Sequence, residues 1–484
     1  MKKLTDILKN TPVREVCGDT AAAIGGLVYD SRAVKPGDCF FAVPGTQSDG
    51  HDYIPIAVEK GAAAIVCERM PADAAEGVAY VLVGDSAGAM ADMAAAFYDY
   101  PRRELKLVGI TGTNGKTTTA TLLYDLVRAM GYKAGLISTV VYKIDGREVE
   151  ATHTTPDSIR LNAMMREMAD AGCAYCFMEC SSHAIVQERT RGLDFAGGIF
   201  SNITHDHLDY HKTFAEYIRA KKLFFDGLPK GAFALTNADD RNGRVMVQNT
   251  AAAVSAYSLR AMADFRCKIV EMHLDGMLLR IDGQELWVGL LGRFNAYNLL
   301  AVYGAAVLLG LDRGEVLRVL SMLHAVSGRF EKIRAANGTT AIVDYAHTPD
   351  ALENVIQTIE EIRTPGQQLI VVCGCGGDRD RTKRPEMAAI AVKYATTAVF
   401  TSDNPRHESP EAILDDMVAG LEPGARYLRI ADRAEAIRTA VMLSRPGDII
   451  LVAGKGHETY QIVGDVKHPF DDREEIKKRF ALLN

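Results

Sequence analysis

Seven consecutive residues have the types and spacing of a phosphate-binding loop: Gly112, Thr113, Asn114, Gly115, Lys116, Thr117 and Thr118. Glycines let the backbone curl so that its N–H groups face an anion, and the N-terminus of a following helix adds positive potential. We expect Lys116 to neutralise the β- and γ-phosphates of a nucleotide and the Thr117 hydroxyl to bind Mg²⁺. The common pattern has an earlier glycine where this chain has Ile110, so the loop is the shorter variant G-x-x-G-K-T.

Glu179 and His207 are candidate metal ligands, and each has a plainer alternative. Glu179 lies near the end of an apolar segment, CFMECS, and His207 lies in HDHLDYH, which could also be merely a polar loop. The residues alone leave both alternatives open. A C-x-x-C pattern can bind zinc, but no second Cys/His pair with ligand spacing accompanies Cys173, Cys176 and Cys180, so we expect these to be core residues of a buried strand.

The phosphate loop needs a strand before it and a helix after it. LKLVGI precedes it and KTTTATLLYDLVRAMG follows, which is the opening unit of a nucleotide-binding α/β fold. Residues 265–290 alternate and carry two D-G turns, which predicts hairpins, and 295–310 predicts a helix that ends at Gly310. Further buried strands are expected at 134–139, 176–181, 195–203 and 232–237.

Two other blocks also alternate strands with helices. The first occupies 1–103 and ends at the polar segment YPRRELK (100–106), and the last begins near SGRFEKI (327–333). Domains usually span roughly 100–200 residues, so this pattern in 484 residues predicts two or three α/β domains. Their strands are expected at 26–31, 39–45, 62–68 and 80–86, and at 339–346, 368–374, 397–403 and 448–454.

Composition narrows the functional class. A hydrophobic content of 48% with 24% charged residues is typical of a globular protein, and a net charge of −7 gives no electrostatic footprint for nucleic acid. MKKLTDILKN lacks the apolar stretch of a signal peptide, and no run of about 18 apolar residues occurs. Nine cysteines, an odd number, favour reduced thiols. We therefore expect a cytoplasmic protein that binds neither nucleic acid nor membrane.

Ordered motifs run the length of the chain. After ITGTNGKTT come MECSSHAIVQER (178–189), SNITHDHLDYH (201–211), AKKLFF (220–225), GRFNAYN (292–298), SGRFEK (327–332), DYAHTPD (344–350), GCGGDRDRTKRP (374–385), DNPR (403–406) and GKGHET (454–459). They resemble, in the same order, the motifs of the Mur ligase family, which also includes folylpolyglutamate synthetase. The last four are similar to those of the members that add the third peptide residue.

The resemblance implies an α/β protein of three domains. These are an N-terminal UDP-sugar-binding domain (1–103), a central P-loop-type ATPase domain with a mostly parallel sheet (104–328), and a C-terminal Rossmann-like domain that binds the amino acid (329–484). The implied reaction is the ATP-dependent addition of meso-diaminopimelate to UDP-N-acetylmuramoyl-L-alanyl-D-glutamate, with Mg²⁺, by a monomer. A substrate carboxylate attacks the γ-phosphate to give an acyl phosphate, and the incoming amine then expels phosphate. This chemistry needs alignment and cations rather than a protein nucleophile.

Residues of this chain that match positions in the family's motifs are expected to have the roles known for the family. The resemblance implies that Glu179, His207 and Thr117 are metal ligands. It also implies that Lys221 is carbamylated by CO₂, a reaction that requires the neutral amine. From its position in Y-x-x-A-K alone, Lys221 looks like a lysine on a helix surface. Neighbouring Lys222 does not match the family position. Adenine and ribose contacts are implied at Asn295, Asn298, Arg329 and Asp344, with Asn295 also well placed as a helix N-cap. The UDP-dipeptide set is Ser31, Thr154, Thr155, Ser181, Gln187 and Arg189; Thr154 to Asp157 also reads as a turn into a helix.

Selection of the amino acid is implied at Arg379, Asp403, Asn404, Pro405, Arg406, Gly454 and Glu458. The far end of meso-diaminopimelate carries a second amine and a second carboxylate. Arg406 can clamp that carboxylate with two hydrogen bonds, and Glu458 can take the far ammonium. Lysine-adding relatives lack the arginine of DNPR.

Three alternatives compete with this hypothesis. A different ligase of the superfamily is disfavoured by DNPR, GKGHE and GGDRD. A P-loop ATPase that drives a conformational switch is disfavoured by the charged C-terminal set, which suits an amino-acid substrate. A sensor of wall precursors without activity is disfavoured because Lys116, Glu179, His207 and Lys221 are all present.

Overall fold

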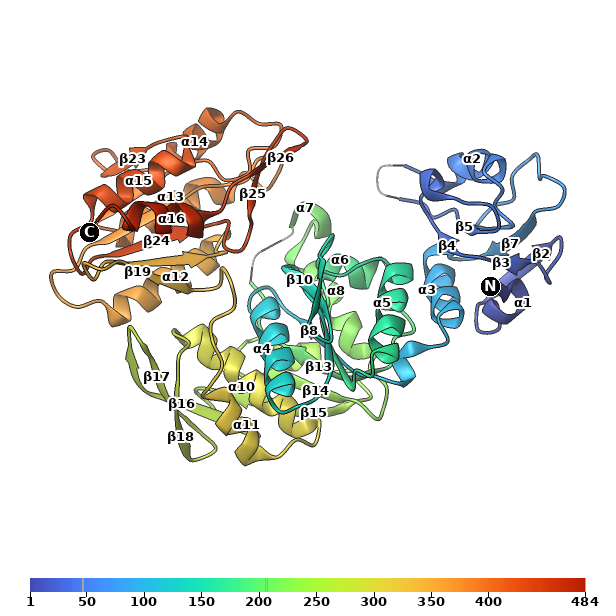
Figure 1. The fold of residues 1–484 in the computed structure, drawn as a ribbon, viewed down its shortest axis with the longest axis horizontal. Coiled ribbons are helices and arrows are strands. Elements are labelled where there is room, and N and C mark those ends of the chain that lie inside the picture. Colours follow the sequence, from blue (N-terminus) through green and yellow to red (C-terminus); the bar gives the residue numbers. More distant parts are fainter. Residues whose placement is uncertain (46–47, 205, 207, 484) are drawn as a thin grey trace.

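The three large β-sheets of the described residues divide the chain into three lobes, which Figure 1 shows with the N-terminal and C-terminal lobes at opposite ends of the central one. The structure is a computed structural model that describes residues 1–45, 48–204, 206 and 208–483. An α/β protein of three lobes with a largely parallel central sheet confirms the predicted fold class. The predicted boundaries after residues 103 and 328 remain our proposal.

The N-terminal lobe is built on a five-stranded sheet, ordered β2-β7-β6-β5-β4. All neighbours pair in parallel except β2, which pairs antiparallel with β7 at the edge. Asp85 caps α3 by accepting from Gly88 N. The elements are β1 Lys2–Lys3, α1 Leu4–Ile7, β2 Val13–Cys17, β3 Ala23–Ile24, β4 Leu27–Val28, β5 Cys39–Phe41, α2 Ile54–Glu59, β6 Ala64–Cys67, β7 Ala79–Val83 and α3 Ser86–Phe97.

The central lobe holds an eleven-stranded sheet, ordered β11-β10-β9-β12-β8-β13-β14-β15-β16-β17-β18. Its middle strands are parallel, and antiparallel hairpins close both ends. The elements are β8 Lys106–Thr111, α4 Lys116–Ala129, β9 Ala134–Ile137, β10 Val141–Ile144, β11 Arg147–Glu150, α5 Ser158–Asp170, β12 Tyr175–Glu179, α6 Ser182–Val186, β13 Phe195–Phe200, α7 Leu208–His211, α8 Phe214–Asp226, β14 Phe233–Asn237, α9 Gly243–Met246, β15 Ala253–Ser258, β16 Phe265–His273, β17 Gly276–Ile281, β18 Gln284–Val288, α10 Arg293–Leu308 and α11 Arg313–Leu320.

The sheet order around β8 positions the site. Strand β8 lies between β12 and β13, so the carboxyl ends of three parallel strands meet at one edge. The phosphate loop follows β8, Glu179 ends β12, and Ser201 follows β13. Ligands of open α/β sheets bind at such an edge, where the connections leave in opposite directions.

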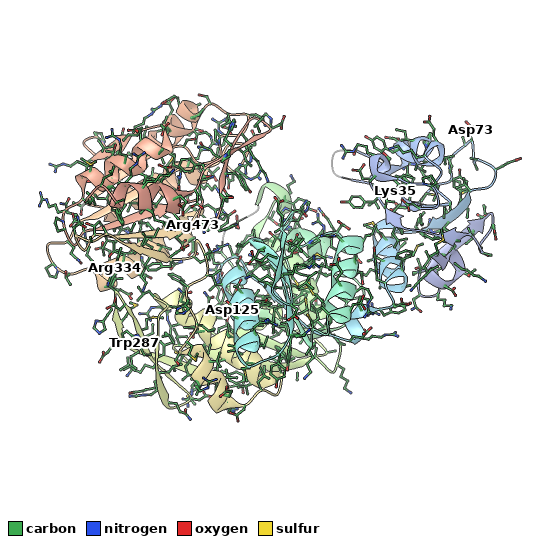
Figure 2. The ribbon with its side chains drawn as sticks, viewed as in Figure 1. Lys35, Asp73, Asp125, Trp287, Arg334 and Arg473 are labelled. Carbon is green, nitrogen blue, oxygen red and sulfur yellow. The ribbon has the colours of Figure 1, made fainter. Side chains whose placement is uncertain are left out.

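The C-terminal lobe has a six-stranded sheet, ordered β19-β20-β24-β21-β22-β23, in which only β19 is antiparallel. It contacts the central lobe through Lys332 and Arg334 of β19, which bond to the β16–β17 turn; Arg334 donates to Asp275 at 2.8 Å, and Figure 2 labels Arg334. The elements are β19 Glu331–Arg334, β20 Thr340–Asp344, α12 Pro349–Ile362, β21 Leu369–Cys373, α13 Lys383–Tyr394, β22 Thr397–Phe400, α14 Pro410–Val418, β23 Tyr427–Arg429, α15 Arg433–Leu443, β24 Ile449–Ala453, β25 Tyr460–Val463, β26 Val466–Pro469 and α16 Asp472–Phe480.

Several local predictions are confirmed. The two D-G turns join β16 to β17 and β17 to β18, and the helix of 295–310 is α10, which begins two residues earlier. Cys173, Cys176 and Cys180 are buried, as expected for core residues beside or within β12. Among the described residues, no helix is both long enough and apolar enough to cross a membrane.

Candidate active site

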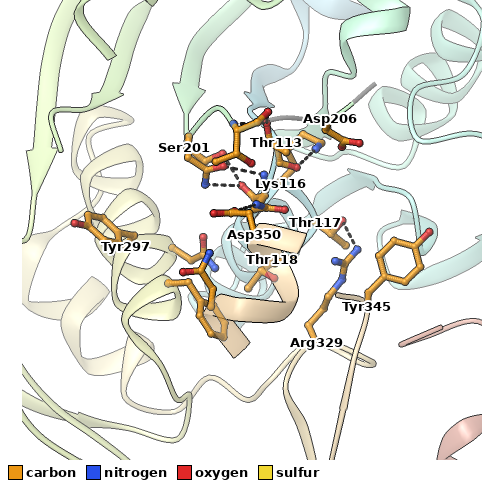
Figure 3. Close-up of a pocket in the computed structure, with 18 of the residues that line it drawn as sticks. Thr113, Lys116, Thr117, Thr118, Ser201, Asp206, Tyr297, Arg329, Tyr345 and Asp350 are labelled. Atoms are coloured by element: carbon orange, nitrogen blue, oxygen red, sulfur yellow. Dashed lines mark hydrogen bonds between the residues drawn. The ribbon is translucent and has the colours of Figure 1, made fainter. Parts of the chain in front are cut away.

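A cavity of about 490 Å³ lies between the central and C-terminal lobes, at the carboxyl edge of the central sheet. Figure 3 shows Lys116 and Thr117 beside Asp350 and Arg329, with Tyr345 next to Arg329, and all of these residues line the cavity. The cavity therefore joins segments more than 200 residues apart; Asn114 Nδ2, for example, donates to Asp350 Oδ2 at 2.9 Å.

The phosphate loop is held in a shape that requires two of its glycines. Gly112 and Gly115 have φ of +149° and +86°, and a Cβ at Gly112 would lie 1.9 Å from Ser201 Oγ. Ser201 Oγ donates to Asn114 O at 2.6 Å, and Asn114 N donates to the Asn202 side chain at 2.9 Å. These contacts fix the backbone before an anion binds, so binding costs the loop little conformational entropy.

Lys116 Nζ folds back onto the loop, donating to Gly112 O at 2.9 Å and to Thr113 O at 2.7 Å. Burial lowers the pKa of this lysine, and Glu179 and Asp206 only partly offset that effect. Because an anion would favour the charged form, the side chain is ready to exchange two carbonyl partners for phosphate oxygens.

Glu179 is buried at the end of β12, and among the described residues Thr139 orients its carboxylate. Its Oε1 accepts from Thr139 N at 2.7 Å, and its Oε2 accepts from Thr139 Oγ1 at 3.2 Å. Oxygen lone pairs of this carboxylate remain available toward the cavity that it lines.

Lys221 is not a surface residue, so the helix-surface alternative is wrong. Its side chain on α8 is buried, with Nζ donating to Gly112 O at 2.7 Å and lying 4.6 Å from the centre of the Tyr217 ring. Burial, and then the charge of Lys116, lowers its pKa well below the usual value. The neutral amine is the form that reacts with CO₂. Lys222 instead points to Asp226, at 2.5 Å.

The donors at this edge suit Mg²⁺. Glu179 and Thr117 supply hard oxygen atoms, and a carbamate on Lys221 would add two more. Thr117 Oγ1 now accepts from Arg329 Nη2 at 3.1 Å. Predicted ligand His207 lies outside the described residues, and the described residues alone contain no cluster of three His, Cys, Asp or Glu side chains able to hold a metal.

The four residues predicted for adenine and ribose line or border this cavity. Asn298 Nδ2 donates to Asn295 Oδ1 at 3.1 Å, and Arg329 stacks 4.6 Å from the Tyr345 ring centre. Burial raises the pKa of Asp344 to about 6. The N-cap prediction for Asn295 is wrong: α10 begins at Arg293 after Gly292, and Asn295 Nδ2 bonds back to Leu291 O at 2.7 Å.

Four of the predicted UDP-dipeptide residues of the central lobe, Thr155, Ser181, Gln187 and Arg189, form one hydrogen-bonded chain. Arg189 donates to Thr155 O at 2.7 Å and to the Gln187 side chain at 2.6 Å, and Ser181 N donates to Thr155 Oγ1 at 3.1 Å. Asp157 caps α5, which confirms the predicted turn into a helix. Thr154 and Ser181 also line the nucleotide cavity, whereas Ser31 lies in the N-terminal lobe.

Tyr29, in the same segment as Ser31, is within reach of charges on the central lobe. Its pKa is raised by burial and by Asp157, while Arg189 lowers it. Since Asp157 and Arg189 belong to the central lobe, Tyr29 lies on the side of the N-terminal lobe that faces it.

The residues predicted to select the amino acid gather at the carboxyl edge of the C-terminal sheet and do not line the nucleotide cavity. Burial, and then the charge of Arg379, lowers the pKa of Arg406, whose Nη1 donates to Gly377 O at 2.8 Å. Glu458 Oε2 accepts from Asn404 Nδ2 at 2.8 Å. Gly454 has φ +115°, and a Cβ there would lie 2.4 Å from Asp403 Oδ2, so the two loops touch at this glycine.

A fully buried ion pair lies beneath these loops. Arg433 of α15 bonds through Nε and Nη2 to both carboxylate oxygens of Asp472 on α16, each at 2.7 Å. The same guanidinium donates to Ser402 O at 3.3 Å and Ala453 O at 3.0 Å, the carbonyls from which the two loops depart.

Family models match three stretches of the chain: "Mur ligase family, catalytic domain" over 23–98, "Mur ligase middle domain" over 110–306, and "Mur ligase, glutamate ligase domain" over 328–456. The chain belongs to the Mur ligase family. Among curated Mur ligases, the UDP-N-acetylmuramoyl-L-alanyl-D-glutamate--2,6-diaminopimelate ligase of Phocaeicola vulgatus is 55% identical over 481 residues, covering 99% of each chain.

Solved Mur ligases share the fold. A structure titled with the same 2,6-diaminopimelate ligase name is 31% identical, covers 100% of this chain and 99% of its own, and superposes with a TM-score of 0.71. MurF ligase from Thermotoga maritima in complex with ADP is 19% identical, covers 94% of this chain and 96% of its own, and has a TM-score of 0.62, which shows likeness of fold.

Some residues of this Mur ligase site were missed from the sequence. Thr139 orients Glu179, Asn202 holds the phosphate loop, and Asp350 joins the two lobes. Asn202 and Asp350 lie within quoted motifs, so they could have been selected from the sequence, whereas Thr139 lies outside every motif.

Proposed function

We propose that this Mur ligase adds meso-2,6-diaminopimelate to UDP-N-acetylmuramoyl-L-alanyl-D-glutamate at the expense of ATP. The observation that carries the proposal is that one cavity is lined both by the phosphate loop and by Thr154 and Ser181 of the UDP-dipeptide set. A carboxylate held by the latter would face the γ-phosphate held by the former. The 55% identity to a curated ligase of that name supports the choice of substrates.

The first step joins the precursor carboxylate to the γ-phosphorus and releases ADP. Lys116 would neutralise the transferred phosphoryl group, and the phosphate-loop N–H groups would hold the β-phosphate. Mg²⁺, when bound by Glu179, Thr117, His207 and the Lys221 carbamate, would neutralise further phosphate charge. Arg329 and Asp344 would place the ribose, and Asn295 and Asn298 the adenine.

The second step needs an amine beside the acyl carbon. The neutral amine attacks, a C–N bond forms, phosphate leaves with the C–O bond electrons, and the nitrogen loses one proton to water. The amino-acid set lies on the C-terminal lobe, so that lobe must bring its ligand to the cavity. Closure would also keep water from the acyl phosphate.

Recognition of the far end of the amino acid would rest on opposite charges. Arg406 and Arg379 would pair the distal carboxylate, Glu458 would take the distal ammonium, and Asp403, Asn404, Pro405 and Gly454 would form the rest of the pocket. We further propose that the protein acts as a cytoplasmic monomer with domains 1–103, 104–328 and 329–484, and that its partners are these small molecules rather than nucleic acid or membrane.

The test is phosphate release with UDP-dipeptide, ATP and Mg²⁺, with one amino acid added at a time. Release should require both the UDP-dipeptide and meso-diaminopimelate. Release without any amino acid would favour an ATPase switch, and release with L-lysine or with a folate and glutamate would favour another ligase of the superfamily.

A further inference from the structure

Lys455 is a buried lysine in the loop after β24, and the reaction described above leaves it without a role. Its Nζ donates to Asn404 Oδ1 at 2.9 Å and to Glu458 Oε2 at 3.0 Å, and it lies 4.0 Å from Asp403 Oδ1. Asp403 and Asn404 belong to the loop after β22, so one ammonium group joins both loops that carry the amino-acid set.

The three side chains Asn404, Lys455 and Glu458 form a closed triangle of hydrogen bonds. Asn404 Nδ2 donates to Glu458 Oε2 at 2.8 Å, while Asn404 Oδ1 accepts from Lys455 and from Ile462 N at 2.9 Å. The cation therefore fixes which end of the Asn404 amide faces the carboxylate. A buried ammonium is costly unless it is paired and hydrogen-bonded, and these partners meet that need.

Both bonds of the triangle that reach Glu458 end on the same oxygen. Oε2 accepts from Lys455 and Asn404, whereas Oε1 accepts no hydrogen bond from the described part of the chain. The carboxylate is thus held at one end and unengaged at the other. A ligand ammonium can bind Oε1 without displacing either existing partner.

We propose that Lys455 is a positioning residue of the amino-acid site, which holds Glu458 and Asn404 so that Oε1 of Glu458 receives the far ammonium of the substrate. The inference rests on the proposed function for the identity of that ammonium. Lys455 acts through Glu458 and Asn404 and does not itself touch the substrate.

The test replaces Lys455 by methionine, which keeps most of the side-chain length and removes the charge. Hydrogen bonds to charged groups contribute about 1.5–3 kcal/mol, so KM for meso-diaminopimelate should rise about 10- to 100-fold. The kcat at saturating amino acid and the KM values for ATP and UDP-dipeptide should stay within about 3-fold, because those sites are separate. Lys467→Met is the matched control: Lys467 is exposed and faces the same Tyr460 ring, at 4.3 Å against 5.9 Å for Lys455.

A double-mutant cycle separates positioning from general loosening of the lobe. In a Glu458→Gln background, Lys455→Met should add less than about 3-fold to KM, because the group it positions is already lost. The proposal would be overturned if the two substitutions raised KM for meso-diaminopimelate by independent factors that multiply in the double variant. A parallel rise in KM for ATP would also overturn it. If Lys455→Met does not fold, Lys455→Gln, which is neutral but can still donate to Asn404, takes its place in the cycle.

The activity of the wild-type protein separates a failure of the proposed substrate from a failure of the proposed role of Lys455. If wild-type protein releases no phosphate with meso-diaminopimelate, the proposed substrate is wrong. The cycle is then measured with the amino acid that does support release, and an unchanged KM in Lys455→Met would still refute the positioning role.

Discussion

Replacing Arg406 by alanine should remove most activity toward meso-diaminopimelate while sparing the nucleotide site. Within the described residues, this guanidinium uses Nη1 for Gly377 O and forms no ion pair, and burial and Arg379 lower its pKa. A half-buried cation that forms no salt bridge is stabilised when an anion binds. A substrate carboxylate is the group that would do so.

The size of the loss in activity follows from the hydrogen bonds that Arg406 would donate to the substrate carboxylate. One edge of the guanidinium can donate two parallel bonds to a carboxylate, each worth about 1.5–3 kcal/mol. Losing about 3–6 kcal/mol corresponds to roughly a 10²- to 10⁴-fold loss in kcat/KM. For the same reason wild-type protein should prefer meso-diaminopimelate to L-lysine by about 10⁴- to 10⁵-fold, as sites do that hydrogen-bond a group one substrate lacks.

The assay is phosphate release with both amino acids for wild type, Arg406→Ala and Arg406→Lys. The lysine variant keeps the charge but loses the planar fork, so its loss should be intermediate. Arg426→Ala, an exposed arginine of the same lobe, is the control. Comparable wild-type kcat/KM for the two amino acids, or a loss in Arg406→Ala that falls on KM for ATP, would refute the reasoning.

Three further predictions concern the nucleotide side. Lys116→Ala should abolish phosphate release and leave calorimetric binding of the UDP-dipeptide largely intact, so wild-type turnover in this variant would contradict the phosphate-loop assignment. Lys221→Ala should be nearly inactive and partly rescued by small carboxylates; an unmodified amine in active protein, seen by mass spectrometry under CO₂, would rule out the carbamate. Burial raises the pKa of Asp344 to about 6, so KM for ATP should rise as pH falls through 6 and the carboxylate is protonated, and Asp344→Asn should show no such rise. The sign for stability is opposite: protonation of Asp344 favours the folded state, and this contribution is lost as pH rises from the ordinary value of 3.8 through 6.

Much of the fold was predictable because its buried strands are continuous runs of apolar residues and the sequence marks where its helices begin and end. The strand–loop–helix unit around Lys116 and the D-G hairpins followed from local sequence. The hairpin of β10 and β11 was missed although it also turns at an Asp-Gly pair, Asp145-Gly146. Its strands are only four residues long, too short for their alternation to stand out.

The site was less predictable, since burial and partners are tertiary properties. From the sequence, Lys221 looks like a solvated helix residue. In the structure its Nζ donates to Gly112 O and lies over the Tyr217 ring. Asn295 has the right type for a cap, but α10 begins at Arg293 with Gly292 as its cap, so Asn295 lies inside the first turn. The role of Lys455 depends on a loop 51 residues away, which spacing cannot reveal.

The buried pair of Arg433 and Asp472 bears on when the protein becomes competent during its own synthesis. The two residues are 39 positions apart, and domains generally fold from the N-terminal side as the chain emerges. Until Asp472 is made, Arg433 has no carboxylate to hold it between Ser402 and Ala453, and the two loops that we propose to bind the amino acid lack their common anchor. A nascent chain can therefore assemble its phosphate loop well before it can choose an amino acid. Pairing at α16 would then act as a late checkpoint that couples completion of the C-terminal lobe to substrate choice.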